Sequence, residues 1–388
     1  MITRRNFTKS LFAATAYASL TSPEMAFATK RPSYRGPNIV IIRYGGGVRR
    51  LETIGAESYS PYMMKHLAPR STLYPNMVID QIRGHETSHG QGTINIITGK
   101  YEAYQEISNR FLGGVLQPTQ PTLFEYFRKS YDIAPHETLI INGENRLEDE
   151  SLNFGTHHQY GVDFRSEFLS SAKFKTFLYQ TQLENDSLTA EQQVDLQSKL
   201  AELQKKAVNL PPLSKTPAPI LRFWQKWQDY YGQTGLKTPR GDRLTTEMTL
   251  WAMRDLKPKM MMVNFQDPDY VHWGIASQYT RAISIIDQGI EAITKYADQD
   301  PFYRDNTVFV IVPDCGRDNN PLLDIPFQHH FNSKSAHEIF CMIYGPKIQK
   351  NKIITRPTDQ SMITQTIAQI MGFKAHHAEN QILDEIGG

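Results

Sequence analysis

Four short polar segments each lie beside a predicted buried strand, and three of them carry acidic or imidazole side chains. They are residues 43–47, 264–274, 313–318 and 327–331, and His337 follows the last of them. Carboxylates and imidazoles that converge from separate strands are the ligands, in type and number, that a divalent metal ion needs. The sequence therefore predicts a metal centre assembled from distant parts of the chain.

The candidate metal ligands come from the last three of these segments and from His337. A single Asp or His at a strand end is commonly structural, so the prediction rests on the order of the segments along the chain. Zinc is the first choice of ion, manganese and calcium are alternatives, and a degenerate site would hold none. The candidate ligands are Asp267, Asp269, His272, Asp314, Cys315 and either His330 or His337.

A fifth polar loop, just before a predicted helix, supplies candidate nucleophiles. These are Thr87, Ser88 and His89. A group at that position could attack phosphorus or sulfur, because the positive end of a helix and a metal ion both lower the cost of its ionised form. Arg43 or Arg317 could bind the anionic oxygens of such a substrate.

Strands and helices alternate along the chain, which predicts an α/β fold with a mostly parallel central sheet and helices on both faces. Residues 94–98 fit either period, and we interpret them as a helix because they follow a glycine-rich polar loop. In open α/β sheets, ligands bind beyond the carboxyl ends of the strands, where the polar segments lie. The predicted strands are 38–42, 138–142, 259–265, 307–312 and 338–344, and the other predicted helices are 121–129, 246–256, 277–296 and 359–371.

Residues 168–235 differ in composition and predict a helical insertion within a domain that otherwise spans residues 29–388. The insertion includes an aromatic helix with Trp224 and Trp227. It could cover one face of the sheet, or it could form a lid or a partner surface. Aromatic residues at helical spacing usually belong to a core, which favours the first interpretation.

The N-terminus predicts an export signal over residues 1–28. Paired arginines, Arg4 and Arg5, are followed by an apolar stretch and then by a small-x-small cleavage site that ends at Ala28. This is the twin-arginine pattern, so we expect a periplasmic protein that is exported after folding. No other stretch has the roughly 18 apolar residues that span a bilayer, so we expect no membrane span after cleavage.

Composition excludes several classes of function. The 388 residues carry a net charge of +2, which gives no reason to expect nucleic acid or a membrane surface as a partner. The two cysteines, Cys315 and Cys341, lie in or beside predicted strands and exclude a disulfide framework, although one bridge between neighbouring strands stays open. The sequence gives no indication of oligomeric state.

The order of the motifs resembles that of the alkaline phosphatase superfamily, which includes sulfatases, phosphodiesterases and cofactor-independent phosphoglycerate mutases. Residues 264–274, NFQDPDYVHWG, are similar to the mutase segment in which an Asp and a His bind one metal. Here Asp269 and His272 stand three apart instead of four, and Asp267 is a second candidate. Residues 310–317 resemble the superfamily strand that ends in Asp-His-Gly, which implies that Asp314 is a metal ligand.

Further matches follow the same order. His330 or His337 matches the later metal-binding His, and residues 344–346 match the exit of the following strand. Residues 96–101 are similar to the end of the superfamily's nucleophile helix. The resemblance covers roughly residues 37–372 apart from the insertion, and it implies an alkaline phosphatase-like fold.

Three positions depart from the superfamily pattern. The first strand ends in Arg43 and Tyr44 where the superfamily has a metal-binding Asp, and Cys315 replaces the His of Asp-His-Gly. Ten positions before Gly99, where the nucleophile usually sits, the residue is His89. The resemblance is nearest to the uncharacterised, twin-arginine-exported, sulfatase-like bacterial proteins, and it implies that one of two metal sites has lost or replaced most of its ligands.

Two hypotheses for function follow. The first is a periplasmic metal-dependent hydrolase that acts on a small anionic substrate, a phosphate or sulfate ester. The second is a noncatalytic superfamily member that binds an anionic ligand or a partner in the cell envelope. The missing ligands favour the second hypothesis, whereas imidazoles at several separate strand ends favour the first, because fold maintenance does not require them there.

Overall fold

Strand β1 (Asn38–Tyr44) lies near the middle of the central sheet in a computed structural model of the chain. It pairs in parallel with β7 (Met260–Phe265) on one side and with β8 (Thr307–Pro313) on the other. From Ser33 onward the chain forms one compact unit. The structure describes residues 31–79, 87–107, 115–143, 148–184, 187–205, 215–232, 241–320, 322, 324–329, 333–379, 381–383 and 386–387.

Nine strands of the described residues form the sheet, with the order β10-β2-β9-β8-β1-β7-β5-β6 and β11 beside β2. Five neighbouring strands, from β8 to β6, run parallel to one another, which confirms the predicted mostly parallel sheet. Strand β9 (Glu338–Tyr344) runs antiparallel to both β8 and β2. The remaining strands of the sheet are β2 (Ser71–Val78), β5 (Thr138–Asn142), β6 (Glu167–Ser170), β10 (Lys352–Ile353) and β11 (Thr358–Asp359).

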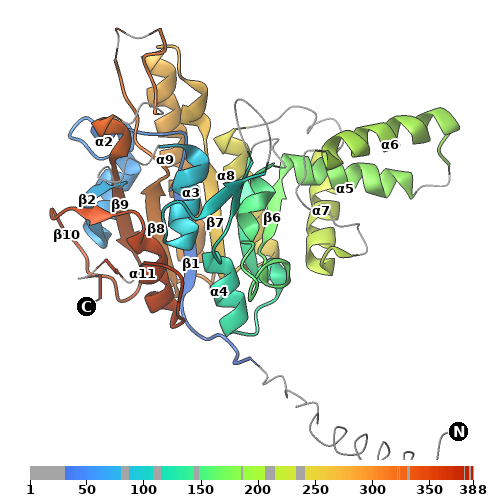
Figure 1. The fold of residues 1–388 in the computed structure, drawn as a ribbon, viewed down its shortest axis with the longest axis horizontal. Coiled ribbons are helices and arrows are strands. Elements are labelled where there is room, and N and C mark those ends of the chain that lie inside the picture. Colours follow the sequence, from blue (N-terminus) through green and yellow to red (C-terminus); the bar gives the residue numbers. More distant parts are fainter. Residues whose placement is uncertain are drawn as a thin grey trace, which may run out of the picture. The chain divides into compact units, whose positions relative to one another are not determined.

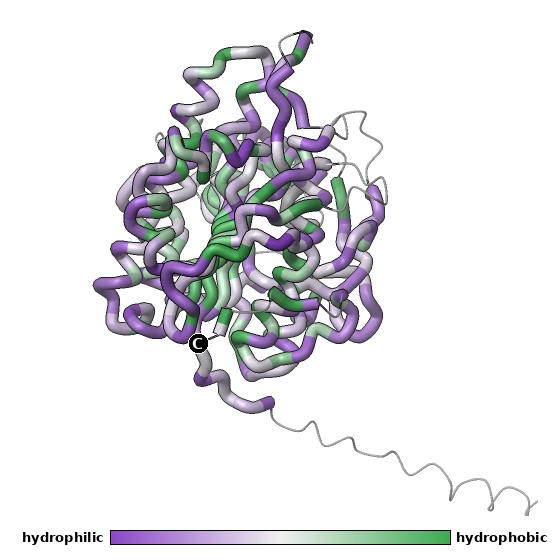
Figure 2. The backbone as a smooth tube through the Cα atoms, turned by 90° about the vertical axis from the view of Figure 1, so that its left-hand side faces the viewer, coloured by the Kyte–Doolittle hydropathy of each residue, from purple (hydrophilic) through white to green (hydrophobic). Residues whose placement is uncertain are grey.

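Alternating side chains of the strands form two hydrophobic cores, one on each face of the sheet. In β1, Val40 and Ile42 face the first core, and Ile39 and Ile41 face the second. Figure 1 shows helices on both faces, and Figure 2 shows hydrophobic residues gathered in the central strands. The first core is covered by α7 (Ala218–Tyr231), α8 (Asp242–Asp255) and α9 (Ala276–Gln299), and the second by α3 (His89–Thr98), α4 (Leu123–Ser130) and α11 (Met362–Met371).

Helix α3 positions the candidate nucleophiles, and it settles the ambiguity of residues 94–98 in favour of a helix. Ser88 caps its first turn, because the Ser88 side chain accepts a hydrogen bond from the Gln91 amide. Gly99 ends it in the left-handed conformation, with a φ of 67°. A Cβ at Gly92 would lie 1.9 Å from the carbonyl oxygen of Asp314, so glycine there allows the helix to pack directly on the end of β8.

The predicted helical insertion begins with strand β6 and continues with α5 (Ser171–Leu183), α6 (Ala190–Gln204) and α7. Phe223, Trp224 and Trp227 of α7 are buried in the first core, whereas α6 buries only Leu196. The aromatic face of α7 therefore serves packing, which favours the structural interpretation of that helix.

The remaining described elements are short. Strands β3 (Tyr104–Glu106) and β4 (Leu116–Pro118) pair as a separate two-stranded sheet. Helices α2 (Arg50–Thr53) and α10 (Lys334–His337) each have four residues. Single helical turns occupy Met63–Leu67, Ala68–Arg70, Pro135–Glu137, Glu148–Asn153, Val162–Phe164 and Asp267–Tyr270, the last of which is η7.

The two cysteines are free thiols, and both are buried. Cys315 follows β8 and Cys341 lies within β9, so the bridge that stayed open from the sequence does not form. In the described part of the chain, no helix is both long and apolar enough to cross a membrane. The predicted signal sequence, residues 1–28, lies outside the described residues.

Candidate metal centre

Polar side chains meet where β1, β7 and β8 end and α3 begins. Because these three strands are parallel, their carboxyl ends lie at the same edge of the sheet, at the upper edge in Figure 1. Asp314 follows β8 directly, Asp269 lies in η7 after β7, and His89 is the first residue of α3. The fold thus brings together residues that are 45 to 225 positions apart in the sequence.

One carboxylate oxygen is the meeting point of three imidazoles. Oδ1 of Asp269 lies 2.7 Å from Nε2 of His89, 3.1 Å from Nε2 of His272 and 3.4 Å from Nε2 of His329. The His329 ring is almost completely buried, and the other three side chains are about 15% exposed. The cluster is therefore close to solvent without facing it fully.

The donor atoms fit a divalent ion. A zinc ion binds nitrogen and oxygen at about 2.0–2.2 Å, so its ligand atoms lie roughly 3–4 Å from one another. The ligand atoms of Asp269, His272 and His329 all lie within 4.8 Å of one another. Those of His89, Cys315 and His329 satisfy the same limit. Small movements of these side chains would close either set around an ion.

His89 bridges two carboxylates. Its Nδ1 lies 2.8 Å from Oδ2 of Asp314, and its Nε2 contacts Asp269. Burial and the positive end of α3 both oppose a charged imidazole, but the two carboxylates outweigh them and raise the pKa of His89 well above its usual value. With both ring nitrogens protonated, His89 is an imidazolium that donates to both acids.

The two carboxylates are correspondingly held in the charged form. Burial opposes ionisation, yet His89 and the other imidazoles lower the pKa of Asp269 far below its usual range. Burial likewise opposes ionisation of Asp314, but His89 and Arg43 hold its pKa at about 2. Asp314 also accepts a hydrogen bond from the Cys315 amide at 2.8 Å.

Arg43 supplies a second fixed cation. Its guanidinium is buried, lies 3.7 Å from Oδ2 of Asp314 and donates to Thr93 and to Gln266. In the superfamily pattern an acidic ligand stands at the end of this first strand. The centre therefore pairs two carboxylates, Asp269 and Asp314, with two protein cations, Arg43 and His89.

The hydroxyl groups of the fifth loop have structural partners. Thr87 is buried, and its hydroxyl donates to the carbonyl oxygen of His329. The Ser88 hydroxyl caps α3 and donates to Oε1 of Gln91. Of the three candidate nucleophiles, His89 is the one whose side chain enters the cluster.

Arg317 does not have the role that the sequence indicated. Its side chain is completely buried, and the guanidinium donates to the carbonyl oxygens of four residues from three segments, so that it binds backbone rather than a ligand. Arg317 is therefore a structural residue of these loops, because its buried guanidinium is bound to backbone carbonyl groups. The four acceptors are Gly46, Gly47, Val271 and Phe327.

Asp267 and His337 also lie apart from the cluster. Oδ1 of Asp267 accepts a hydrogen bond from the Asp242 amide at 3.0 Å, so Asp267 caps α8. His337 is buried at the end of α10 and belongs to neither potential ligand set. His330 lies outside the described residues. The third imidazole of the cluster is His329, which the sequence placed in the right segment but did not single out.

The glycine turn after β1 explains how these loops approach one another. Gly46 and Gly47 have φ values of 82° and 68°, which favour glycine. A Cβ at Gly46 would lie 2.5 Å from the amide nitrogen of Asp269. Without glycine, the turn could not pack against the segment that carries Asp269.

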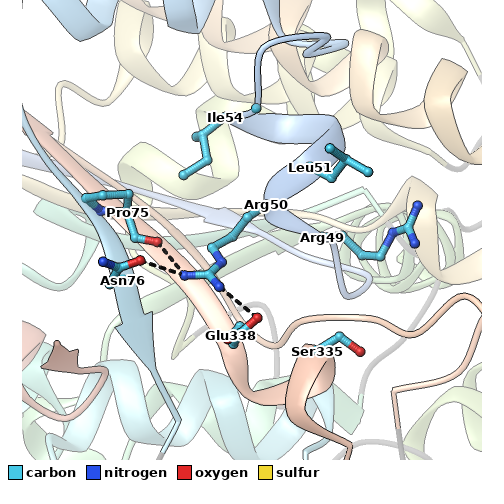
Figure 3. A pocket seen from close by; sticks show the side chains of 9 residues that line it. Arg49, Arg50, Leu51, Ile54, Pro75, Asn76, Ser335 and Glu338 are labelled. Carbon is cyan, nitrogen blue, oxygen red and sulfur yellow. Dashed lines mark hydrogen bonds and ion pairs between the residues drawn. The ribbon is translucent and has the colours of Figure 1, made fainter. Parts of the chain in front are cut away.

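Arg49 and Arg50 line a groove of about 480 Å³ beside α2 (Figure 3). Arg50 forms an ion pair with Glu338 at 2.7 Å and donates to Asn76 at 2.9 Å. Arg49 pairs with Glu52, with its Nε 2.9 Å from Oε2. Because each guanidinium already has a carboxylate partner, neither forms an open anion site.

The sequence matches no protein-family model and no curated protein. Solved structures, in contrast, match most of the chain. A mutant of the alkaline phosphatase PafA aligns with a TM-score of 0.55 and 11% identity, over 92% of this chain and 100% of that chain. An alkaline phosphatase superfamily protein from Vibrio parahaemolyticus aligns with a TM-score of 0.53 and 12% identity, over 90% and 70%.

A third match is a 2-O GAG sulfatase, with a TM-score of 0.50 and 12% identity, over 88% of this chain and 71% of that chain. All three likenesses cover about nine tenths of this chain. At such low identity they bear on fold alone. They show that the chain has the fold of the alkaline phosphatase superfamily, as its motifs indicated.

Proposed function

We propose that the protein is an exported, metal-dependent hydrolase of phosphate or sulfate esters with a divergent metal site. The observation that carries the proposal is the convergence of Asp269, His272 and His329, two imidazoles and one carboxylate, at the carboxyl ends of parallel strands. These residues would hold the ion. Zinc suits two nitrogens and one oxygen best, and three protein ligands leave a coordination position for water or substrate.

The ion, when bound, would act as a Lewis acid on the ester and lower the pKa of a water molecule. Each ring nitrogen of His89 contacts a carboxylate, so His89 is suited to donate a proton to the leaving oxygen rather than to attack. Asp314 fixes the orientation of the His89 ring through Nδ1. Arg43 stabilises the ionised form of Asp314, and its two terminal nitrogens donate to Thr93 and Gln266.

An anionic ester fits this centre electrostatically. His89 is the first residue of α3, so it lies at the positive end of that helix. Backbone amides at the start of a helix favour negatively charged groups. A sulfatase and a phosphatase among the similar structures support an ester of this kind as the substrate. The twin-arginine pattern at Arg4 and Arg5 supports export to the periplasm.

A pair of variants tests the proposal. Asp269 and Asp267 stand two positions apart in η7, but only Asp269 lies in the cluster. Protein purified without chelator should contain one ion per chain and cleave aryl phosphates, phosphodiesters or aryl sulfates. Asp269→Asn should lose ion and turnover together, whereas Asp267→Asn should keep both, because an Asn oxygen can still accept from the Asp242 amide.

A second function, binding of an anionic ligand or an envelope partner without catalysis, is favoured by the charge balance of the centre. Arg43 and His89 neutralise both carboxylates with no contribution from an ion. This second function is supported if the purified protein is folded but contains no metal and cleaves none of the phosphate or sulfate esters tested.

A further inference from the structure

Two ligand sets overlap at one residue. Asp269, His272 and His329 form an oxygen-nitrogen-nitrogen set, and His89, Cys315 and His329 form a nitrogen-sulfur-nitrogen set. The rings of His89 and His329 are adjacent, with centroids 4.2 Å apart. Because His329 belongs to both sets, an ion in one set denies that residue to the other.

The second set differs from the first in its chemistry. Sγ of Cys315 lies 3.8 Å from Nδ1 of His89 and is completely buried. Thiolate is a soft ligand and prefers soft ions such as copper(I) and cadmium, whereas a set of one carboxylate and two imidazoles suits zinc or the harder manganese. The two sets should therefore select different ions.

Asp269 has a function in both sets. In the first set its carboxylate is itself a ligand. In the second set, a His89 that binds an ion through Nδ1 can keep its Nε2–H bonded to Oδ1 of Asp269, at the 2.7 Å seen in the structure. A carboxylate that accepts from the second nitrogen of a metal-bound imidazole is the usual means of orienting such a ligand.

We propose that a thiophilic ion, such as copper(I), binds at His89, Cys315 and His329 and excludes the ion of the hydrolytic set. Binding releases the thiol proton of Cys315 and the Nδ1 proton of His89 to water. The same event removes His329 from the first set and His89 from its contact with Asp314, so it inhibits hydrolysis. The inhibitory consequence rests on the proposed function, whereas the binding site does not.

Cadmium is a suitable probe, because thiolate ligation of cadmium gives a charge-transfer absorption in the ultraviolet. We expect wild-type protein to bind one cadmium ion per chain with this absorption, and to release bound manganese, measured by electron paramagnetic resonance, as cadmium is added. Cys315→Ser should abolish the absorption. Cys341→Ser, which changes the other buried free cysteine, should retain it.

Three results would overturn the proposal. They are cadmium binding without thiolate absorption in the wild type, absorption that persists in Cys315→Ser, and manganese that stays bound beside cadmium. If Cys315→Ser does not fold, X-ray absorption of the wild-type cadmium complex decides, since one sulfur must appear among the ligands. Wild-type protein that shows the cadmium-thiolate absorption but neither binds manganese nor turns over an ester would reject only the proposed hydrolase. Wild-type protein that turns over an ester but shows no cadmium-thiolate absorption would reject only the thiolate site.

Discussion

Replacing Arg317 by methionine tests whether one buried cation holds the loops of the centre together. The guanidinium donates to Gly47 at 2.8 Å, to Val271 at 2.6 Å, to Phe327 at 3.0 Å and also to Gly46. These carbonyl groups belong to the glycine turn, the segment of Asp269 and the segment of His329. Methionine fills much of the same volume but offers no donor.

The loss of stability can be worked from these contacts. Four carbonyl oxygens without a donor, at about 1–1.5 kcal/mol each, cost about 4–6 kcal/mol. Removing the cation returns part of that cost, because burial disfavours the charged form and lowers the pKa of Arg317. We expect a net decrease of about 3 kcal/mol in the free energy of unfolding.

Chemical denaturation measures the decrease, and metal analysis of the folded variant measures its effect on the centre. Arg304→Met is a matched control, because Arg304 is exposed, and it should change stability by less than about 0.5 kcal/mol. Arg317→Met should also hold less metal at equal free concentration. Stability within about 1 kcal/mol of the wild type would refute the reasoning, since the carbonyl groups would then not depend on this donor.

Three further substitutions have clear expectations. Gly92→Ala places a Cβ 1.9 Å from the Asp314 carbonyl oxygen, so α3 must move, and we expect a loss of about 1–3 kcal/mol in unfolding experiments together with weaker metal binding. Burial raises the pKa of Glu125 to about 7 from 4.5, so its contribution to stability is full below pH 4.5 and is lost as pH rises through 7. Thermal melting should therefore show that the stability of the wild type relative to Glu125→Gln falls by up to about 3 kcal/mol over that window. A stability difference that stays constant with pH would contradict this expectation. Asp242→Ala leaves the Gln266 amide without its acceptor, at 2.8 Å, and should cost about 2 kcal/mol in denaturant titrations, unlike Asp242→Asn.

The parallel part of the sheet is predictable from the sequence because local pattern determines it. Strands β1, β5, β7 and β8 are short apolar runs, and such runs indicate strands buried on both faces. Strand β2 was not predicted, because Pro75 and Asn76 interrupt it and both residues are typical of turns. Its pairing with β9 shifts register between Tyr74 and Met77, which accommodates the interruption. The antiparallel direction of β9 depends on the path of the segment that connects β8 to β9. The residues of β9 itself do not specify that path.

The candidate centre was predictable to the level of segments. The structure brings together Asp269, His272, Asp314, Cys315 and His89, each of which the residue types indicated. It also places His329, rather than its neighbour, against Asp269. Which of two adjacent loop residues points inward depends on backbone conformation, which composition and spacing do not specify. The same reason applies to Arg317, whose guanidinium binds backbone carbonyl groups.

The balance of charge within the centre affects how the chain can fold. Both acids are matched by cations that the polypeptide itself provides, so no uncompensated repulsion opposes collapse of the chain. An ion is therefore not needed to offset these charges while the chain folds. A polypeptide with this property needs no dedicated metal delivery while it folds.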